Sequence, residues 1–132
     1  MPNAADTLGT VFVNGTAALL ARVVGYDAAP VVQADISAIE YTIFELDDTD
    51  ATVRTPVDGH EAVSLIVADV IFDTLQTDGV WTADAEGYNF LHIVDITSTQ
   101  AFTTVEKQYL VEFSLTPVAG QPILVRFRIS VI

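Results

Sequence analysis

Three aspartates in one short loop come closest, of all residues in this chain, to the spacing of a metal site. Asp47, Asp48 and Asp50 stand within four residues, directly after an apolar stretch. Carboxylate oxygens are the ligands that calcium prefers. The EF-hand pattern is not met, because counting from Asp48 puts Val53 at the glycine position and Gly59 at the glutamate position. Two interpretations stay open: a weak calcium site, or a solvated acidic loop that binds no cofactor, which is the commoner case.

Two histidines are the candidate general bases. His92 shares a strand face with Phe90 and Val94 by alternation, which predicts a core or half-buried side chain. His60 follows Asp58-Gly59 in a turn, and we expect it to be solvated. Nucleophilic catalysis needs a nucleophile next to such a base, and the chain has neither a G-x-S-x-G elbow nor a cysteine. We therefore expect a protein that is not an enzyme and has no catalytic residues.

An aromatic group forms the third candidate site. Trp81, Tyr88 and Phe90 cluster around an Asp-Gly turn. In one interpretation Trp81 and Tyr88 form a platform that binds a sugar, because aromatic rings offer large and rigid contact surfaces. In the other interpretation, which we favour, Trp81 plugs the end of a β-sandwich and covers the helical segment expected at 68–76.

Composition narrows the choice of partner. The 132 residues carry 18 acidic and five basic side chains, for a net charge of −13, and 51% of residues are hydrophobic. Binding to nucleic acid or to an anionic membrane surface relies on Lys and Arg, so we exclude both. The hydrophobic fraction excludes disorder. Such charge fits a solubilising surface or, as the sharper alternative, a cation site or a basic partner.

Targeting signals are not evident in the sequence. The stretch up to Gly15 has no basic residue before its apolar part, so we expect no secretory signal peptide. No apolar run approaches the roughly 18 residues that a membrane-spanning helix needs.

The last stretch, Lys107–Ile132, predicts a β-hairpin. Tyr109, Val111, Phe113 and Leu115 share one face, opposite Leu110, Glu112 and Ser114. In the second run Ile123, Val125, Phe127, Ile129 and Val131 share one face, opposite Leu124, Arg126, Arg128 and Ser130. Period-two alternation is typical of strands with one face on a core. The Pro- and Gly-containing segment 116–122 supplies the turn. We therefore expect Phe113 and Phe127 to be buried.

The rest of the chain predicts further strands with one exception. Strands are expected in the ranges 10–13, 17–24, 36–46, 52–58, 62–67 and 88–96, separated by turn signals. Residues 68–76 are the exception, because Val67, Val70, Ile71 and Leu75 fall at helical spacing, and we expect Asp69 to cap the first turn. We expect an N-terminal arm over residues 1–9 and one domain over 10–132: an all-β sandwich of about seven antiparallel strands with a short helical insert at 68–76.

Residues 18–46 and 109–132 together resemble a known kind of module. ALLARVVGYDAAPVVQADISAIEYTIFEL is similar to the opening of immunoglobulin-like domains, and YLVEFSLTPVAGQPILVRFRISVI is similar to their closing hairpin. Tyr109 stands where a tyrosine-corner residue would sit. The antibody Cys pair is absent. Modules of this kind recur in bacteriophage virions, in baseplate, tail, neck and capsid-decoration proteins.

This resemblance implies a structural role. We expect a small virion component, made in the host cytoplasm, that decorates or connects a larger particle by protein–protein contacts. Its partners would be protein subunits, with many copies on a scaffold or a homo-oligomer, joined through the N-terminal arm and an exposed sheet edge near Ile132. The alternative function is a carbohydrate-recognising adhesin module that uses Trp81 and Tyr88.

Overall fold

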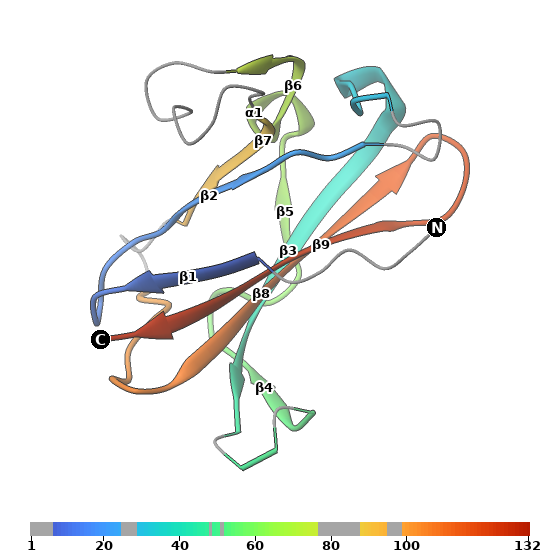
Figure 1. Cartoon of the computed structure of the whole chain (residues 1–132). Coiled ribbons are helices and arrows are strands. Elements are labelled where there is room, and N and C mark those ends of the chain that lie inside the picture. Colours follow the sequence, from blue (N-terminus) through green and yellow to red (C-terminus); the bar gives the residue numbers. More distant parts are fainter. Residues whose placement is uncertain (1–6, 25–28, 48, 51, 77–87, 95–98) are drawn as a thin grey trace.

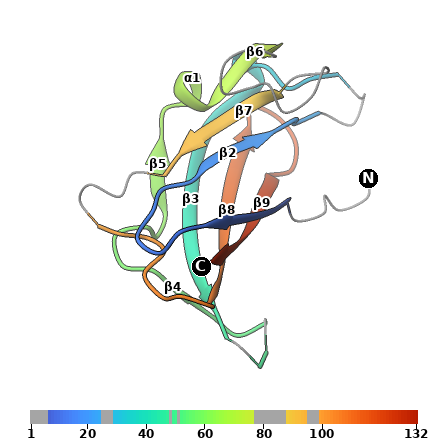
Figure 2. The same cartoon turned by 60° about the vertical axis from the view of Figure 1, so that its left-hand side comes forward.

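The computed structural model describes residues 7–24, 29–47, 49–50, 52–76, 88–94 and 99–132, which form two β-sheets packed face to face (Figure 1, Figure 2). The expected all-β, immunoglobulin-like sandwich is confirmed, with nine strands in the described ranges instead of about seven. In chain order the elements are β1 (Thr7–Val11), β2 (Ala18–Ala21), a 3₁₀ turn (Gln33–Asp35), β3 (Ile36–Leu46), β4 (Arg54–Pro56), β5 (Val63–Leu65), α1 (Val67–Val70), β6 (Ile71–Gln76), β7 (Tyr88–Ile93), β8 (Gln108–Pro117) and β9 (Ile123–Val131).

The larger sheet is built around the longest strands. Its order is β1-β9-β8-β3-β4, and β5 also pairs with β3. β8 pairs antiparallel with both β3 and β9, so these three strands form the middle of the sheet. β3 has the limits expected from the sequence, and the β8–β9 hairpin is confirmed. β1 runs parallel to β9 along one edge.

The smaller sheet has the order β2-β7-β6 and covers the inner face of the larger one (Figure 2). Strand order places the fold among immunoglobulin-like sandwiches, since β9-β8-β3-β4 follows the G-F-C-C′ order and β2-β7-β6 follows B-E-D. The first strand differs from the antibody constant-domain arrangement, because it pairs with the last strand instead of the second.

Aromatic side chains fill the space between the sheets. Phe113 lies at their centre, with ring centroids 4.8 Å from Phe90, 5.5 Å from His92, 5.7 Å from Tyr41 and 5.8 Å from Phe127. The predicted inward face of β8 is confirmed, because its alternate residues from Tyr109 to Leu115 are fully buried. The core is therefore held by residues from both sheets.

The helical insert is shorter than the sequence predicted. Only Val67–Val70 is helical, and the prediction for residues 71–76 is wrong, since they form β6. The reason is tertiary: Ile71 is buried and pairs with Phe90, which extends the smaller sheet by one strand. Ile66, not Asp69, is the N-cap, and it makes no side-chain cap. Nowhere in the described ranges is a helix long and apolar enough to cross a membrane.

The first strand begins inside the segment expected to be an arm. Residues 7–9 belong to β1 and pair with β9, so at most residues 1–6, which lie outside the described ranges, can be an arm. Gly9 suits this position, because a Cβ there would stand 3.1 Å from Ile129 Cδ1. β1 also covers the edge of β9 that we expected to be exposed near Ile132, so that expectation is wrong. In the described chain, the outer edges of the sheets belong to β1 and β4–β5 in the larger and to β2 and β6 in the smaller.

Candidate functional site

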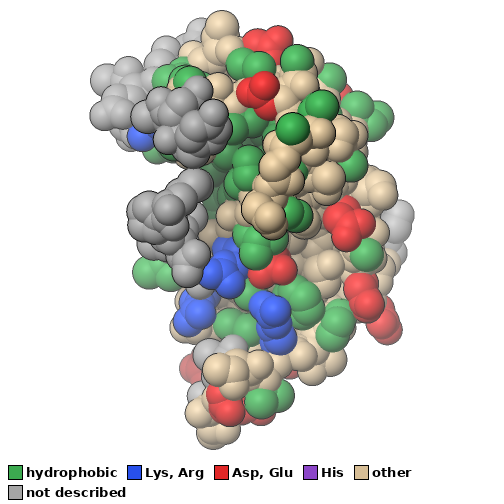
Figure 3. Space-filling view, turned by 90° about the vertical axis from the view of Figure 1, so that its right-hand side faces the viewer, with side chains coloured by type: hydrophobic (Ala, Val, Ile, Leu, Met, Phe, Trp, Pro, Cys, Tyr) green, Lys and Arg blue, Asp and Glu red, His purple; other side chains and the backbone are tan. Residues whose placement is uncertain are grey.

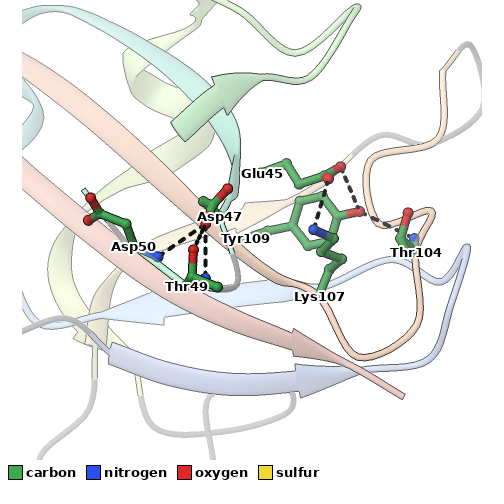
Figure 4. A network of polar contacts seen from close by, with 7 residues as sticks. All are labelled: Glu45, Asp47, Thr49, Asp50, Thr104, Lys107 and Tyr109. Carbon is green, nitrogen blue, oxygen red and sulfur yellow. Dashed lines mark hydrogen bonds and ion pairs between the residues drawn. The ribbon is translucent and has the colours of Figure 1, made fainter. Parts of the chain in front are cut away.

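The acidic loop after β3 uses its carboxylates within the loop. Asp47 Oδ1 accepts the backbone N–H groups of Thr49 at 2.9 Å and Asp50 at 3.1 Å, and the Thr49 hydroxyl at 2.7 Å (Figure 4). Asp50 Oδ1 accepts the N–H and the hydroxyl of Thr52 at 3.0 and 2.6 Å. Both are Asx-turn contacts. Asp48 lies outside the described residues, and those described contain no group of three potential metal ligands.

These hydrogen bonds favour the ionised aspartates. The side chain and backbone of Thr49 hold the pKa of Asp47 below its ordinary value, and Thr52 does the same to the pKa of Asp50. A carboxylate that accepts hydrogen bonds is easier to ionise. Asp47 and Asp50 therefore serve as turn-forming residues in this structure.

Asp47→Ala is expected to destabilise the protein more at neutral pH than in acid. A pKa that is lower in the folded state than the unfolded value near 3.8 stabilises the fold above that pH, and this stabilisation is lost as the pH falls below it. Urea unfolding of both proteins at neutral pH and near pH 3 measures the difference. An equal loss at the two pH values would show that the charge of Asp47 contributes nothing.

Of the two residues of the predicted sugar platform, the structure describes only Tyr88. Trp81 lies outside the described residues, so neither the platform nor the plug can be assigned to it. Tyr88 begins β7 and is half-buried, with the Arg22 guanidinium 5.2 Å above its ring centroid. A cation in this position is attracted to the ring face. That face of Tyr88 is thus occupied by the chain's own arginine.

The histidines both belong to the core. His92 is half-buried against Tyr41 and Phe113, as the alternation predicted. The prediction of a solvated His60 is wrong, because only 3% of this residue is exposed. His60 Nε2 lies 2.7 Å from the Thr99 carbonyl oxygen, and Nδ1 lies 2.8 Å from the Tyr41 hydroxyl. A carbonyl only accepts, so Nε2 carries the proton, and in the neutral ring Nδ1 accepts from Tyr41.

His60→Ala is expected to cost about 2–4 kcal/mol of stability. The change leaves the Tyr41 hydroxyl and the Thr99 carbonyl without this partner, and each buried polar group left unsatisfied costs about 1–3 kcal/mol. Urea unfolding measures the loss, with Glu61→Ala, an exposed neighbour, as the control. A loss below about 1 kcal/mol would mean that water replaces the imidazole.

The outer face of the larger sheet combines apolar side chains with basic ones. A row of cross-strand neighbours runs from Leu8 on β1 through Arg128 and Leu110 to Phe44 on β3. Leu110 is buried within this row, whereas Leu8 is 76% exposed. Leu124 is also exposed. We call this surface the outer face; its members are Leu8, Phe44, Arg54, Leu110, Glu112, Leu124, Arg126 and Arg128.

Arginines dominate the charge of the outer face. Arg54 Nη1 and Arg126 Nη1 lie 3.7 and 3.9 Å from the same Glu112 oxygen, Oε2. The Arg54 guanidinium also stands 4.4 Å above the Phe44 ring centroid. With Arg128, the three arginines and Glu112 sum to a formal charge of +2 in a chain of −13, and Glu40, in the same cross-strand row as Leu124, lowers the sum for this face of the sheet to +1. Figure 3 shows Lys and Arg side chains gathered low on one side of this view, with hydrophobic and acidic ones beside them.

The other basic residues lie elsewhere. Lys107 Nζ is 3.8 Å from Glu45 Oε1, and Glu45 Oε2 accepts a hydrogen bond of 3.4 Å from the Tyr109 hydroxyl (Figure 4). That hydroxyl in turn accepts the Thr104 N–H at 3.2 Å, a contact to backbone just upstream of the kind expected for a tyrosine corner. The outer face thus holds three of the five Lys and Arg residues of the chain.

No protein-family model, curated protein or solved structure matches this chain. The outer face is therefore interpreted from its own geometry and charge. Sequence reasoning missed it, although Arg126 and Arg128 alternate with inward residues and are the basic pair of an acidic chain. The pairing of β4 with β3, which brings Arg54 to the same face, could not be read from that alternation.

Proposed function

We propose that this chain is a non-enzymatic building block of a multi-subunit assembly, with the outer face as its docking surface. The observation that supports this most is the joint presence of three arginines, Phe44 and the exposed Leu8 and Leu124 on a sheet face that no described element covers. Arginine and aromatic residues are enriched in protein–protein interfaces, in which exposed apolar groups become buried. The partner surface would be acidic.

The resemblance to immunoglobulin-like virion modules supports a virion as the assembly. Such a particle presents many copies of a small domain on a scaffold. A charge of −13 opposes association of copies through surfaces that are not complementary in charge. A local basic surface would then direct where a copy attaches. Residues 1–6 stay a second proposed contact, separate from the outer face.

Fractionation of native extracts by size tests the proposed function. In cells that naturally carry the chain, it should elute with large particles, and Arg126→Ala/Arg128→Ala should shift it toward the size of the free chain. Ala119→Glu/Gln121→Glu is the matched control, because it also changes the net charge by two but lies in the exposed β8–β9 turn. Elution of the wild-type chain only at the size of the free domain would contradict the proposal.

A further inference from the structure

The larger sheet is electrically polarised from one side to the other. Arg126 and Arg128 lie on β9, beside the edge strand β1. At the opposite edge, residues 54–65 run along β3, held by hydrogen bonds from Val57 N–H to Ile43 O and from Ile43 N–H to His60 O. This edge exposes the carboxylates of Asp58 and Glu61 together with Arg54, and Glu40 lies next to it on β3, so these four side chains sum to a formal charge of −2. Figure 3 shows basic side chains gathered low on one side of this view, whereas acidic ones lie along the opposite margin and also at the top, at the bottom and beside the basic group.

We define two surfaces on this basis. The basic strip consists of Leu8, Leu124, Arg126 and Arg128, and the acidic edge consists of Glu40, Asp58 and Glu61. We propose that the basic strip of one copy docks against the acidic edge of a second copy, so that copies associate side by side in one direction. This inference rests on the proposed function and names the neighbour in the assembly.

Charge complementarity selects this arrangement. A two-fold pairing of outer faces would place Arg126 and Arg128 against the same residues of the other copy, and like charges in contact repel. A head-to-tail contact brings arginine to carboxylate and lets Leu8 and Leu124 lose exposed apolar surface. Such a heterologous contact produces a ring or an open row of copies. At physiological salt, dissolved ions screen interactions between charges more than about 8 Å apart. The attraction between arginine and carboxylate at the contact therefore acts over a short range, in spite of the net charge of −13.

Sedimentation velocity of the purified full chain tests the contact. At physiological salt the sedimentation coefficient should rise between micromolar and millimolar concentration. Arg126→Glu/Arg128→Glu and, separately, Glu40→Lys/Glu61→Lys should each weaken self-association by at least about tenfold, equivalent to about 1.4 kcal/mol. Asp69→Lys/Glu106→Lys is the control for the second variant, because it makes the same charge change at exposed positions outside both surfaces. Circular dichroism verifies that each variant is folded.

Mixing the two variants gives a sharper result. The first keeps its acidic edge and the second keeps its basic strip, and their two altered surfaces are also opposite in charge, so the mixture should regain association in rows that alternate between the two variants. A single chain with all four substitutions keeps the net charge of −13 and should again self-associate, since both surfaces have exchanged sign.

Three outcomes would overturn the inference: a wild-type chain that stays monomeric at all concentrations, a control that loses association as strongly as the acidic-edge variant, or a fourfold variant that stays monomeric. A monomeric purified chain that still elutes with large particles in native extracts would refute this contact alone. The proposed function would then stand with a different neighbour.

Discussion

Phe113→Ala is expected to lower the free energy of unfolding by about 3–5 kcal/mol, the usual cost of removing a buried phenylalanine. Phe113 has no exposed surface, and its ring touches four aromatic rings. Phe90 and His92 belong to the smaller sheet, whereas Tyr41 and Phe127 belong to the larger one. The cavity would therefore open between the sheets, where neither backbone can move in without breaking its own strand pairing.

Urea denaturation monitored by circular dichroism measures this loss. Phe12→Ala is the matched control, because the Phe12 side chain is 73% exposed and its removal should change stability by less than about 0.5 kcal/mol. Similar losses for the two variants would mean that the inner face of β8 has been assigned wrongly. A domain of this size commonly has only about 5–15 kcal/mol to lose.

Asn89→Leu is expected to be comparably damaging, by about 3–5 kcal/mol, although it adds apolar volume. Asn89 is fully buried on β7, and its side-chain amide forms hydrogen bonds with the backbone of the segment that follows β2. Its Oδ1 accepts the Val23 N–H at 2.7 Å, and its Nδ2 donates to the carbonyl oxygens of Val23 and Val31, both at 2.9 Å. Leucine would leave the Val23 N–H and the Val31 carbonyl without this partner, each at about 1–3 kcal/mol before relaxation, whereas Val23 O would keep its bond from Val31 N–H.

Thermal and urea unfolding of Asn89→Leu test this role. Gln108→Leu at the exposed start of β8 is the control for the same kind of polar-to-apolar change and should be nearly neutral. Because Val31 N–H also donates to Val23 O at 2.9 Å, hydrogen exchange at Val23 and Val31 should speed up in the Asn89 variant. Unchanged exchange at these two amides would contradict the assigned role.

The long strands could be predicted because their signals are local. β8 and β9 alternate over most of their length and β3 alternates from Ile39 to Ile43, so in these stretches tertiary packing only confirms what alternation indicates. Short elements carry too few residues for such a pattern. The spacing of Val67, Val70 and Ile71 is consistent with a helix. After one helical turn, however, pairing with β7 stabilises residues 71–76 more than a longer helix would.

Most of the candidate site depends on contacts between distant residues. Arg54 and Arg126 approach one carboxylate because β4, β3, β8 and β9 lie in that order, and strand order is not written in any one segment. His60 illustrates the converse error. Its Asp-Gly neighbours are typical of a solvated turn, yet the turn folds back along β3 and buries the ring beside Tyr41.

The parallel pairing of β1 with β9 bears on how the domain would carry tension. Thr7 lies beside Phe127 and Val11 beside Val131, so the two strands run in the same direction along their whole contact. A pull that draws Thr7 and Val131 apart slides one strand lengthwise past the other. The evenly spaced hydrogen bonds of a parallel pair are then loaded together and must give way as a group, whereas a pull across a hairpin opens its bonds one after another. A block seated in a particle through its first and last strands would resist stretching in this way.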